Sequence, residues 1–194
     1  MVADCTGHGV PGALLSMVGN SLLNEIVIEN GITNPAEILN QLRTKLITTL
    51  SKKGGEQVKD GMDVSLLKLK IENEKLKIQI ACANNPVYIV RKGELTEIKP
   101  DRQPIGFSYN PKPFTLQEIE LHEGDAIYMT TDGFQDQFGG DNGKKLMRRG
   151  LKAFLVSIAH LPMKEQGDRL KEFFYQWKGD RFQVDDVCVV GIRV

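Results

Sequence analysis

The spacing of apolar residues along this chain changes from helical to alternating, and that change limits the folds available to it. After a first strand at Val2–Asp4, apolar residues recur at helical spacing from Pro11 to Glu29. A second helix is predicted from Asn34, because Asn at the cap, Pro at the first helical position and Glu at the third form a helix start. From Met62 onward apolar and polar residues alternate, which is typical of half-buried strands.

This alternation predicts an antiparallel meander of strands in the middle of the chain. Two adjacent strands, Val64–Ile71 and Leu76–Ile80, flank a polar turn, and a second hairpin, Pro86–Ile98, turns at Lys92-Gly93. The remaining expected elements are strands near Phe114–Leu121 and at Ala126–Thr130, two helices between Lys144 and Trp177 that break near Pro162, and a final strand, Val187–Val194. Helices segregated from antiparallel strands predict an α+β fold, a layered sandwich of two antiparallel sheets flanked by helices.

Length and composition set further limits. A chain of 194 residues with 41% apolar and 26% charged residues is expected to form one globular domain, residues 1–194. Since it opens in mid-strand, we expect its N-terminal strands to be missing, so that the domain is truncated. Net charge is zero, which gives no electrostatic footprint for nucleic acid. No apolar run approaches the length needed to cross a bilayer, so no direct membrane contact is expected.

The three cysteines are Cys5, Cys82 and Cys188. They are widely spaced, odd in number and set in apolar context, without a metal-binding spacing. We interpret them as buried, reduced thiols, which places the chain in the cytoplasm.

Three acidic stretches lie far apart in the chain, and each adjoins an apolar run. They contain Asp4, Asp132 and Asp185. Carboxylates brought together at strand ends repel one another unless cations lie between them, so the pattern predicts a site for a hard divalent metal. Asp185 and Asp186 would point to opposite faces if they lay in a strand, and only one of them could then face the metal. Asp63 is a weaker candidate of the same kind.

The glycines of the first turn allow another interpretation. Residues Gly7–Gly12 match G-x-G-x-x-G between a strand and a helix, as in a dinucleotide-binding oxidoreductase. The following helix leads to another helix rather than to a parallel strand, and no acidic residue ends a strand at the expected distance. His8 within this turn is either a general acid or a turn histidine whose ring binds the backbone.

The order of these motifs resembles a known family. The segments are Asp4-Cys5-Thr6-Gly7-His8-Gly9-Val10-Pro11-Gly12-Ala13, Asp60-Gly61-Met62-Asp63, Asn84-Asn85-Pro86, Pro104-Ile105-Gly106, Thr131-Asp132-Gly133 and Asp185-Asp186. Together they resemble the bacterial stage II sporulation protein E-like serine/threonine phosphatases, a branch of the metal-dependent type 2C phosphatase superfamily. The resemblance runs the whole length of the chain.

The resemblance implies a site with two Mn²⁺ or Mg²⁺ ions. Asp4 matches the aspartate that bridges both ions, the main-chain carbonyl of Cys5 matches the adjacent ligand, and Asp132 and Asp185 match further ligands. Asp136 matches an aspartate linked to a third, weaker metal. These residues would act through a metal-activated water that hydrolyses phosphoserine or phosphothreonine, with His8 as a candidate general acid. The family carries a further metal aspartate in an upstream strand, and no such strand precedes Asp4 here.

The implied role is the catalytic domain of a bacterial signalling protein. Its substrate would be a phosphorylated regulatory protein, such as an anti-sigma-factor antagonist in partner switching. An upstream sensor domain, in a parent protein that can be membrane-attached, would act through the helical pair at residues 11–53. A homodimer is among the oligomeric states left open. The alternative function is a catalytically inactive phosphoprotein-binding or scaffold domain with an incomplete metal site.

Overall fold

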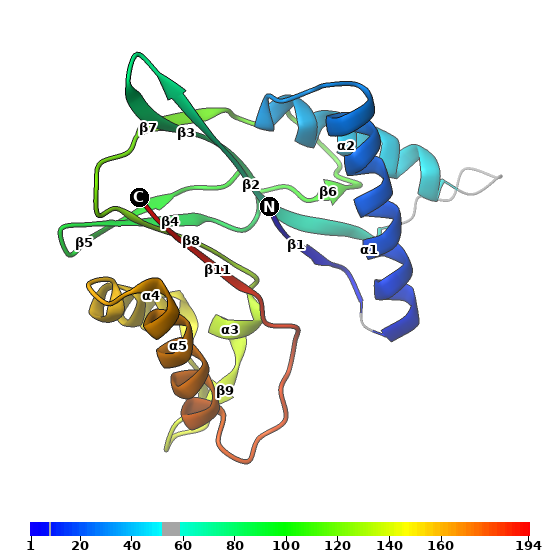
Figure 1. Ribbon diagram of the computed structural model, residues 1–194. Coiled ribbons are helices and arrows are strands. Elements are labelled where there is room, and N and C mark those ends of the chain that lie inside the picture. Colours follow the sequence, from blue (N-terminus) through cyan, green and yellow to red (C-terminus); the bar gives the residue numbers. More distant parts are fainter. Residues whose placement is uncertain (8, 52–58) are drawn as a thin grey trace. The chain divides into compact units, whose positions relative to one another are not determined.

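The computed structural model describes residues 1–7, 9–51 and 59–194, which form two compact units. Unit 1 comprises Met1, Ala3–Asn85 and Lys99–Leu121, and unit 2 comprises Val2, Pro86–Ile98 and His122–Val194. Each unit has one main antiparallel sheet with helices beside it (Figure 1). The α+β class and the two antiparallel sheets are as the sequence predicted.

Unit 1 holds a five-stranded sheet in the order β1-β2-β3-β7, with β6 also paired to β2. Its elements are β1 (Val2–Cys5), α1 (Gly9–Asn24), η1 (Glu25–Glu29), α2 (Pro35–Leu50), β2 (Gly61–Glu72), β3 (Lys75–Ala83), β6 (Ile105–Gly106) and β7 (Gln117–Glu120). Strands β2 and β3 pair antiparallel across the predicted polar turn, where Asn73 and Glu74 both adopt positive φ.

Two helical segments pack on this sheet. Helix α2 begins as predicted, because the Asn34 side chain accepts hydrogen bonds from the main-chain N–H groups of Ala36 and Glu37, at 3.0 and 3.2 Å. Fully buried leucines of α2 form the core with apolar residues of β2 and β3: Leu39, Leu42, Leu46, Val64 and Ala81. The first helix reaches Glu29 as expected, but its last turn, η1, is a π-helix.

The continuous helical segment Gly9–Glu29 corrects one expectation. By its 21 residues and its apolar composition it is long enough to span a membrane, which the sequence reading had excluded. Helices buried in the core of globular proteins and signal sequences meet the same test. Here Leu15, Gly19 and Ile26 are buried, and Leu15 and Ile26 belong to the core of unit 1. Length and composition alone are weak evidence for a membrane span, so no span is assigned to this segment.

Unit 2 holds a four-stranded sheet in the order β11-β8-β4-β5 and a two-stranded one. Its elements are β4 (Val87–Arg91), β5 (Glu94–Ile98), β8 (Ala126–Thr130), α3 (Gly133–Asp136), β9 (Phe138–Gly139), β10 (Lys144–Lys145), α4 (Met147–Ile158), α5 (Met163–Lys178) and β11 (Val189–Arg193). The β4–β5 hairpin turns at Lys92-Gly93, both at positive φ, as predicted. Apolar residues of α4 and α5 pack with β4 and β8, including Leu151, Leu155, Leu170, Tyr88 and Tyr128.

Some features differ from the sequence expectations. Strand β11 begins at Val189, so Asp185 and Asp186 lie in a loop, and the argument from alternating strand faces does not apply to them. The short helix α3 follows the Asp132 turn and was not predicted. Of the three cysteines, which are all free, Cys82 is buried, Cys5 is half-buried and Cys188 is exposed, so the expectation of three buried thiols was wrong.

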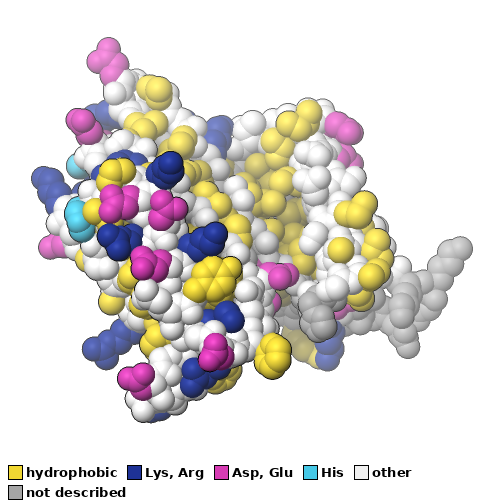
Figure 2. Space-filling view, turned by 60° about the horizontal axis from the view of Figure 1, so that its bottom comes forward, with side chains coloured by type: hydrophobic (Ala, Val, Ile, Leu, Met, Phe, Trp, Pro, Cys, Tyr) yellow, Lys and Arg dark blue, Asp and Glu magenta, His cyan; other side chains and the backbone are white. Residues whose placement is uncertain are grey.

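The molecular surface carries both signs of charge. On part of the face shown in Figure 2, Lys and Arg side chains are interspersed with Asp and Glu side chains, and elsewhere on that face hydrophobic side chains predominate. This agrees with the balance of 25 basic and 25 acidic residues in the sequence.

Candidate metal site

In unit 1, Asp4 lies half-buried in β1, just before the glycine turn. Thr6 ties this strand to the start of β2, because its N–H donates to Gly61 O at 2.9 Å and its Oγ1 accepts from Gly61 N at 3.2 Å. The turn that follows contains Gly7 and Gly9 at positive φ. A Cβ on Gly12 would lie 2.6 Å from Gly7 O, so the turn closes against the first residues of α1.

Two further predicted residues of unit 1 have defined neighbours. Asp63, on β2, accepts a hydrogen bond at its Oδ1 from Asn84 Nδ2 at 2.8 Å, and Asn84 adopts a φ of 59°. The thiol of Cys5 accepts a bond from Ser16 Oγ at 3.3 Å, which leaves the Cys5 main-chain carbonyl as the group that the resemblance assigns to a metal. His8 lies outside the described residues.

In unit 2, Thr131 joins the two predicted aspartate segments. Its N–H donates to Cys188 O at 3.0 Å, and its Oγ1 accepts from Cys188 N at 2.9 Å and donates to Asp186 O at 2.9 Å. Thr131 itself is buried. Asp132 and Asp185, which are 53 positions apart in the sequence (185 − 132), therefore lie on neighbouring segments of unit 2.

Gly133 allows this close approach. A Cβ at this position would lie 2.5 Å from the main-chain oxygen of Asp186 and 3.2 Å from the carbonyl carbon of Asp185. Because those atoms belong to the backbone, a side chain could fit only if the loop moved. Asp132 is half-buried at the start of α3, and its side chain does not cap that helix, whereas Asp185 is exposed.

Gln137 fixes the loop that leads to Asp185. Its side chain is fully buried, and its Nε2 donates to Phe138 O and Phe182 O, both at 3.0 Å. Its Oε1 accepts from Val184 N at 3.3 Å. Sequence reasoning missed Gln137 and the linking role of Thr131. Local sequence does not indicate these contacts, because Phe182 and Val184 lie more than 40 positions from Gln137.

Asp136 already has a cationic partner. Lys145 Nζ lies 2.8 Å from Asp136 Oδ2, and both side chains are more than a third exposed. The hydrogen bond to Asp136 and the negative charge of that carboxylate raise the pKa of Lys145, and the charge of Asp132 adds to the effect. An ammonium group therefore lies where the resemblance suggested a third, weak metal.

The donor set can be judged against Mn²⁺ and Mg²⁺ for each unit by itself. Carboxylates and a main-chain carbonyl are hard oxygen donors, which both ions prefer. Unit 2 fits this chemistry, because Thr131 and Gly133 bring the Asp132 and Asp185 segments together. Within either unit, the described residues contain no group of three His, Cys, Asp or Glu side chains close enough to hold an ion by themselves.

Comparison with known families identifies the family of this chain. The family model for stage II sporulation protein E (SpoIIE) matches residues 1–194. The chain belongs to the SpoIIE family. No curated protein matches it.

Solved structures show the same fold. The SiaA-PP2C domain of Pseudomonas aeruginosa is 27% identical and superposes with a TM-score of 0.85, covering 99% of this chain and 74% of that one. The PP2C phosphatase domain of SpoIIE from Bacillus subtilis, with a fragment of its regulatory domain, is 20% identical with a TM-score of 0.69, covering 98% and 52%. The RsbU and RsbW domains of Rv1364c from Mycobacterium tuberculosis are 21% identical with a TM-score of 0.72, covering 98% and 50%. The chain thus has the PP2C phosphatase fold and spans about half the length of the last two structures. The dinucleotide-binding alternative is thereby set aside.

Proposed function

We propose that this SpoIIE-family chain is a metal-dependent serine/threonine protein phosphatase domain of a bacterial signalling protein. The observation that carries the proposal is the Thr131 link between the Asp132 and Asp185 segments of unit 2, in a chain whose whole length matches the family. Those two aspartates lie far apart in sequence, and the buried Thr131 hydroxyl holds their segments together. A site in which both carboxylates bind the same ions needs such a link.

The proposed ligands are Asp4 and the Cys5 main-chain carbonyl in unit 1, and Asp132 and Asp185 in unit 2. These residues would hold two Mn²⁺ or Mg²⁺ ions, which would supply a water of lowered pKa and would neutralise charge on the phosphoryl oxygens. The chain's own residues hold the carboxylates in place: Gln137 and Thr131 fix the Asp185 loop, and Thr6 anchors the strand that carries Asp4. His8 is retained as the candidate proton donor to the leaving serine or threonine oxygen.

Asp136 is not needed as a ligand in this proposal. Its carboxylate is paired with Lys145, so we expect metal binding to depend little on it. Replacement of Asp136 by Asn should leave the Mn²⁺ stoichiometry unchanged.

The partners and the regulation belong to the same proposal. A substrate such as a phosphorylated anti-sigma-factor antagonist in the cytoplasm agrees with the family. Helices α1 and α2 are proposed to relay the state of an upstream sensor domain to the metal site, because α1 begins directly after the turn that follows Asp4. Substitutions on the outer faces of both helices should then alter sensor control in the full-length protein, and unchanged control would contradict the relay.

The decisive experiment measures hydrolysis of p-nitrophenyl phosphate by this chain during titration with Mn²⁺. The variant is Asp132→Asn, and the matched control is Asp141→Asn, which changes an exposed aspartate in the turn between β9 and β10. We expect Mn²⁺-dependent turnover that falls at least ~100-fold in Asp132→Asn, beyond the usual loss for an outer-shell partner, and little change in the control.

Two outcomes would contradict the proposal. Turnover that persists in chelator would rule out metal dependence, and equal activity of the two variants would remove Asp132 from the site. A folded protein that binds a phosphoprotein without turnover would favour the scaffold function.

A further inference from the structure

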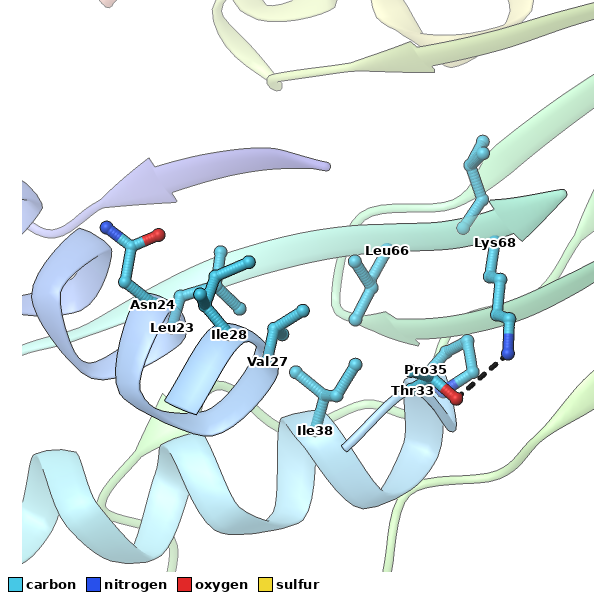
Figure 3. Close-up of a pocket in the computed structure, with 10 residues that line it drawn as sticks. Leu23, Asn24, Val27, Ile28, Thr33, Pro35, Ile38, Leu66 and Lys68 are labelled. Carbon is cyan, nitrogen blue, oxygen red and sulfur yellow. Dashed lines mark hydrogen bonds between the residues drawn. The ribbon is translucent and has the colours of Figure 1, made fainter. Parts of the chain in front are cut away.

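A cavity lies in unit 1 between η1, the start of α2 and β2 (Figure 3). Its volume is about 360 Å³, within the range of pockets that bind small molecules. It is separate from the residues proposed to hold metal, none of which lines it.

The walls of the cavity are mostly apolar and come from the end of α1, η1, the start of α2 and β2. Val27 and Ile28 belong to η1, and Ile28 is 74% exposed at the rim. Ile38 of α2 and Leu66 of β2 are buried and form the inner part. Such a surface favours a hydrocarbon group, since each buried CH₂ contributes about 0.8 kcal/mol.

One side of the opening is polar. Lys68 Nζ donates to Thr33 Oγ1 at 2.9 Å, as the dashed line in Figure 3 shows. Lys68 makes no ion pair with any carboxylate in the described part of the chain, and none of the lining residues is acidic. Two positions further along the same strand, Lys70 pairs with Glu118 at 2.9 Å. Among the described residues that line the cavity, Lys68 is the only one with an ammonium group, and that group is available for an anion.

We propose that this cavity binds an aliphatic monocarboxylate. The hydrocarbon chain would lie against Val27, Ile38 and Leu66, and the carboxylate would accept hydrogen bonds from Lys68 Nζ and Thr33 Oγ1. One ammonium and one hydroxyl match a single negative charge, whereas a phosphate dianion would keep unpaired charge. Charge-assisted hydrogen bonds of this kind are roughly twice as strong as neutral ones.

The ligand would contact η1, which gives the site a structural consequence. π-Helical turns are rare and are found mostly at functional sites. Here η1 joins α1 without a break, so a ligand that packs on Val27 would stabilise the junction of α1 and η1. Binding itself does not depend on the proposed phosphatase activity, so it is tested separately.

The test is isothermal titration calorimetry of the full chain with decanoate, below its micellar concentration, and with decanol as the uncharged probe. The variant Lys68→Met removes the cation, and Lys70→Met makes the same change on the same face of β2 outside the cavity. Val27→Trp fills the cavity. We expect decanoate to bind on the order of tenfold more tightly than decanol, Lys68→Met to abolish that preference, Lys70→Met to preserve it, and Val27→Trp to abolish binding of both probes.

Several results would overturn the proposal. Equal binding of decanol and decanoate would identify an apolar slot for a partner's side chain instead. Decanoate affinity that is unchanged in Lys68→Met, or unchanged in a folded Val27→Trp, would place the ligand elsewhere. If Val27→Trp does not fold by circular dichroism, the comparison of Lys68→Met with Lys70→Met decides alone.

Discussion

Both units carry exposed ion pairs, but unit 2 also has a pair whose carboxylate is buried. In unit 1, lysines and glutamates of β2, β3 and β7 form exposed pairs along the sheet surface: Lys70, Lys75 and Lys77 with Glu72, Glu118 and Glu120. In unit 2, Asp125 is 1% exposed and forms a two-bond pair with Arg91, at 2.9 and 2.6 Å. Exposed pairs contribute little because water screens them, whereas a buried carboxylate depends on its partners.

The same contrast applies to the proposed site residues. Asp4 of unit 1 lies in a regular strand, and helix packing supports its surroundings. Asp185 of unit 2 lies in an irregular loop that the buried polar side chains of Thr131 and Gln137 hold in place. We therefore expect single polar substitutions to disturb unit 2 far more than unit 1.

The largest effect is expected for Asp125→Asn. The change leaves the Arg91 guanidinium without its counter-charge, and breaking a buried ion pair costs ~3–5 kcal/mol. Because Arg91 is about a third exposed, we expect the lower end, about 3 kcal/mol, in urea unfolding. Glu118→Gln, in the exposed ladder of unit 1, is the matched change and should leave the midpoint unaltered. Equal losses of unfolding free energy in the two variants would contradict the proposed difference between the units.

The same pair predicts a dependence of stability on pH. Burial raises the pKa of Asp125, but hydrogen bonds from Arg91 and the His122 main-chain N–H, with the charge of Arg91, outweigh it and hold the pKa below its usual value. A depressed pKa stabilises the folded state fully above the unfolded value, about 4, and the contribution is lost as pH falls through the folded pKa. Wild-type stability should fall in that acid range, and the fall should be smaller in Asp125→Asn.

The next effect is expected for Gly133→Ala. The new Cβ would lie 2.5 Å from Asp186 O, so the Asp185 loop must shift, at a cost of roughly 1–3 kcal/mol. We also expect weaker Mn²⁺ binding in calorimetry. The opposite sign is expected for Gly167→Ala in α5, where a Cβ meets no atom within 4 Å, because alanine favours a helix by ~1 kcal/mol over glycine. Full Mn²⁺ affinity in Gly133→Ala would show that the loop position does not control the metal.

Sequence alone predicted the elements that local chemistry determines. The Asn34-Pro35 helix start, the Lys92-Gly93 turn and a strand from Met62 onward each depend on neighbouring residues, and each is confirmed. Burial along that strand does not alternate as expected, because Leu69 and Ile71 are exposed. It also selected Asp132 and Asp185 as candidates. It did not predict that Thr131 joins their segments or that Gln137 binds Phe182, since those bonds are set by tertiary packing. That both units contribute to one metal site stays a prediction.

A smaller effect is expected for Asn34→Ala in unit 1. The substitution removes the two hydrogen bonds that cap α2, and loss of such a cap costs about 1 kcal/mol. Asn110→Ala, which changes an exposed residue of the same unit, is the control and should leave thermal stability unchanged. The loss should appear in thermal unfolding while Mn²⁺ affinity is kept, because no proposed ligand lies on α2. A fall in Mn²⁺ affinity as large as that expected for Gly133→Ala would contradict this prediction.

The smallest effect is expected for Tyr88→Phe, and its cross-strand neighbour provides the control. Tyr88 and Tyr128 lie opposite each other in β4 and β8, and burial raises the pKa of each to about 12, so both stay neutral at ordinary pH. Tyr128 donates to Gln166 Oε1 at 2.6 Å, whereas the Tyr88 hydroxyl has no hydrogen-bond partner among the described residues. Tyr128→Phe should therefore cost ~1–2 kcal/mol in urea unfolding, while Tyr88→Phe should be neutral or slightly stabilising, because it removes an unpaired buried hydroxyl. A loss in Tyr88→Phe as large as that in Tyr128→Phe would mean that the Tyr88 hydroxyl binds an ordered water, and that unit 2 depends on buried polar contacts even more than its direct hydrogen bonds indicate.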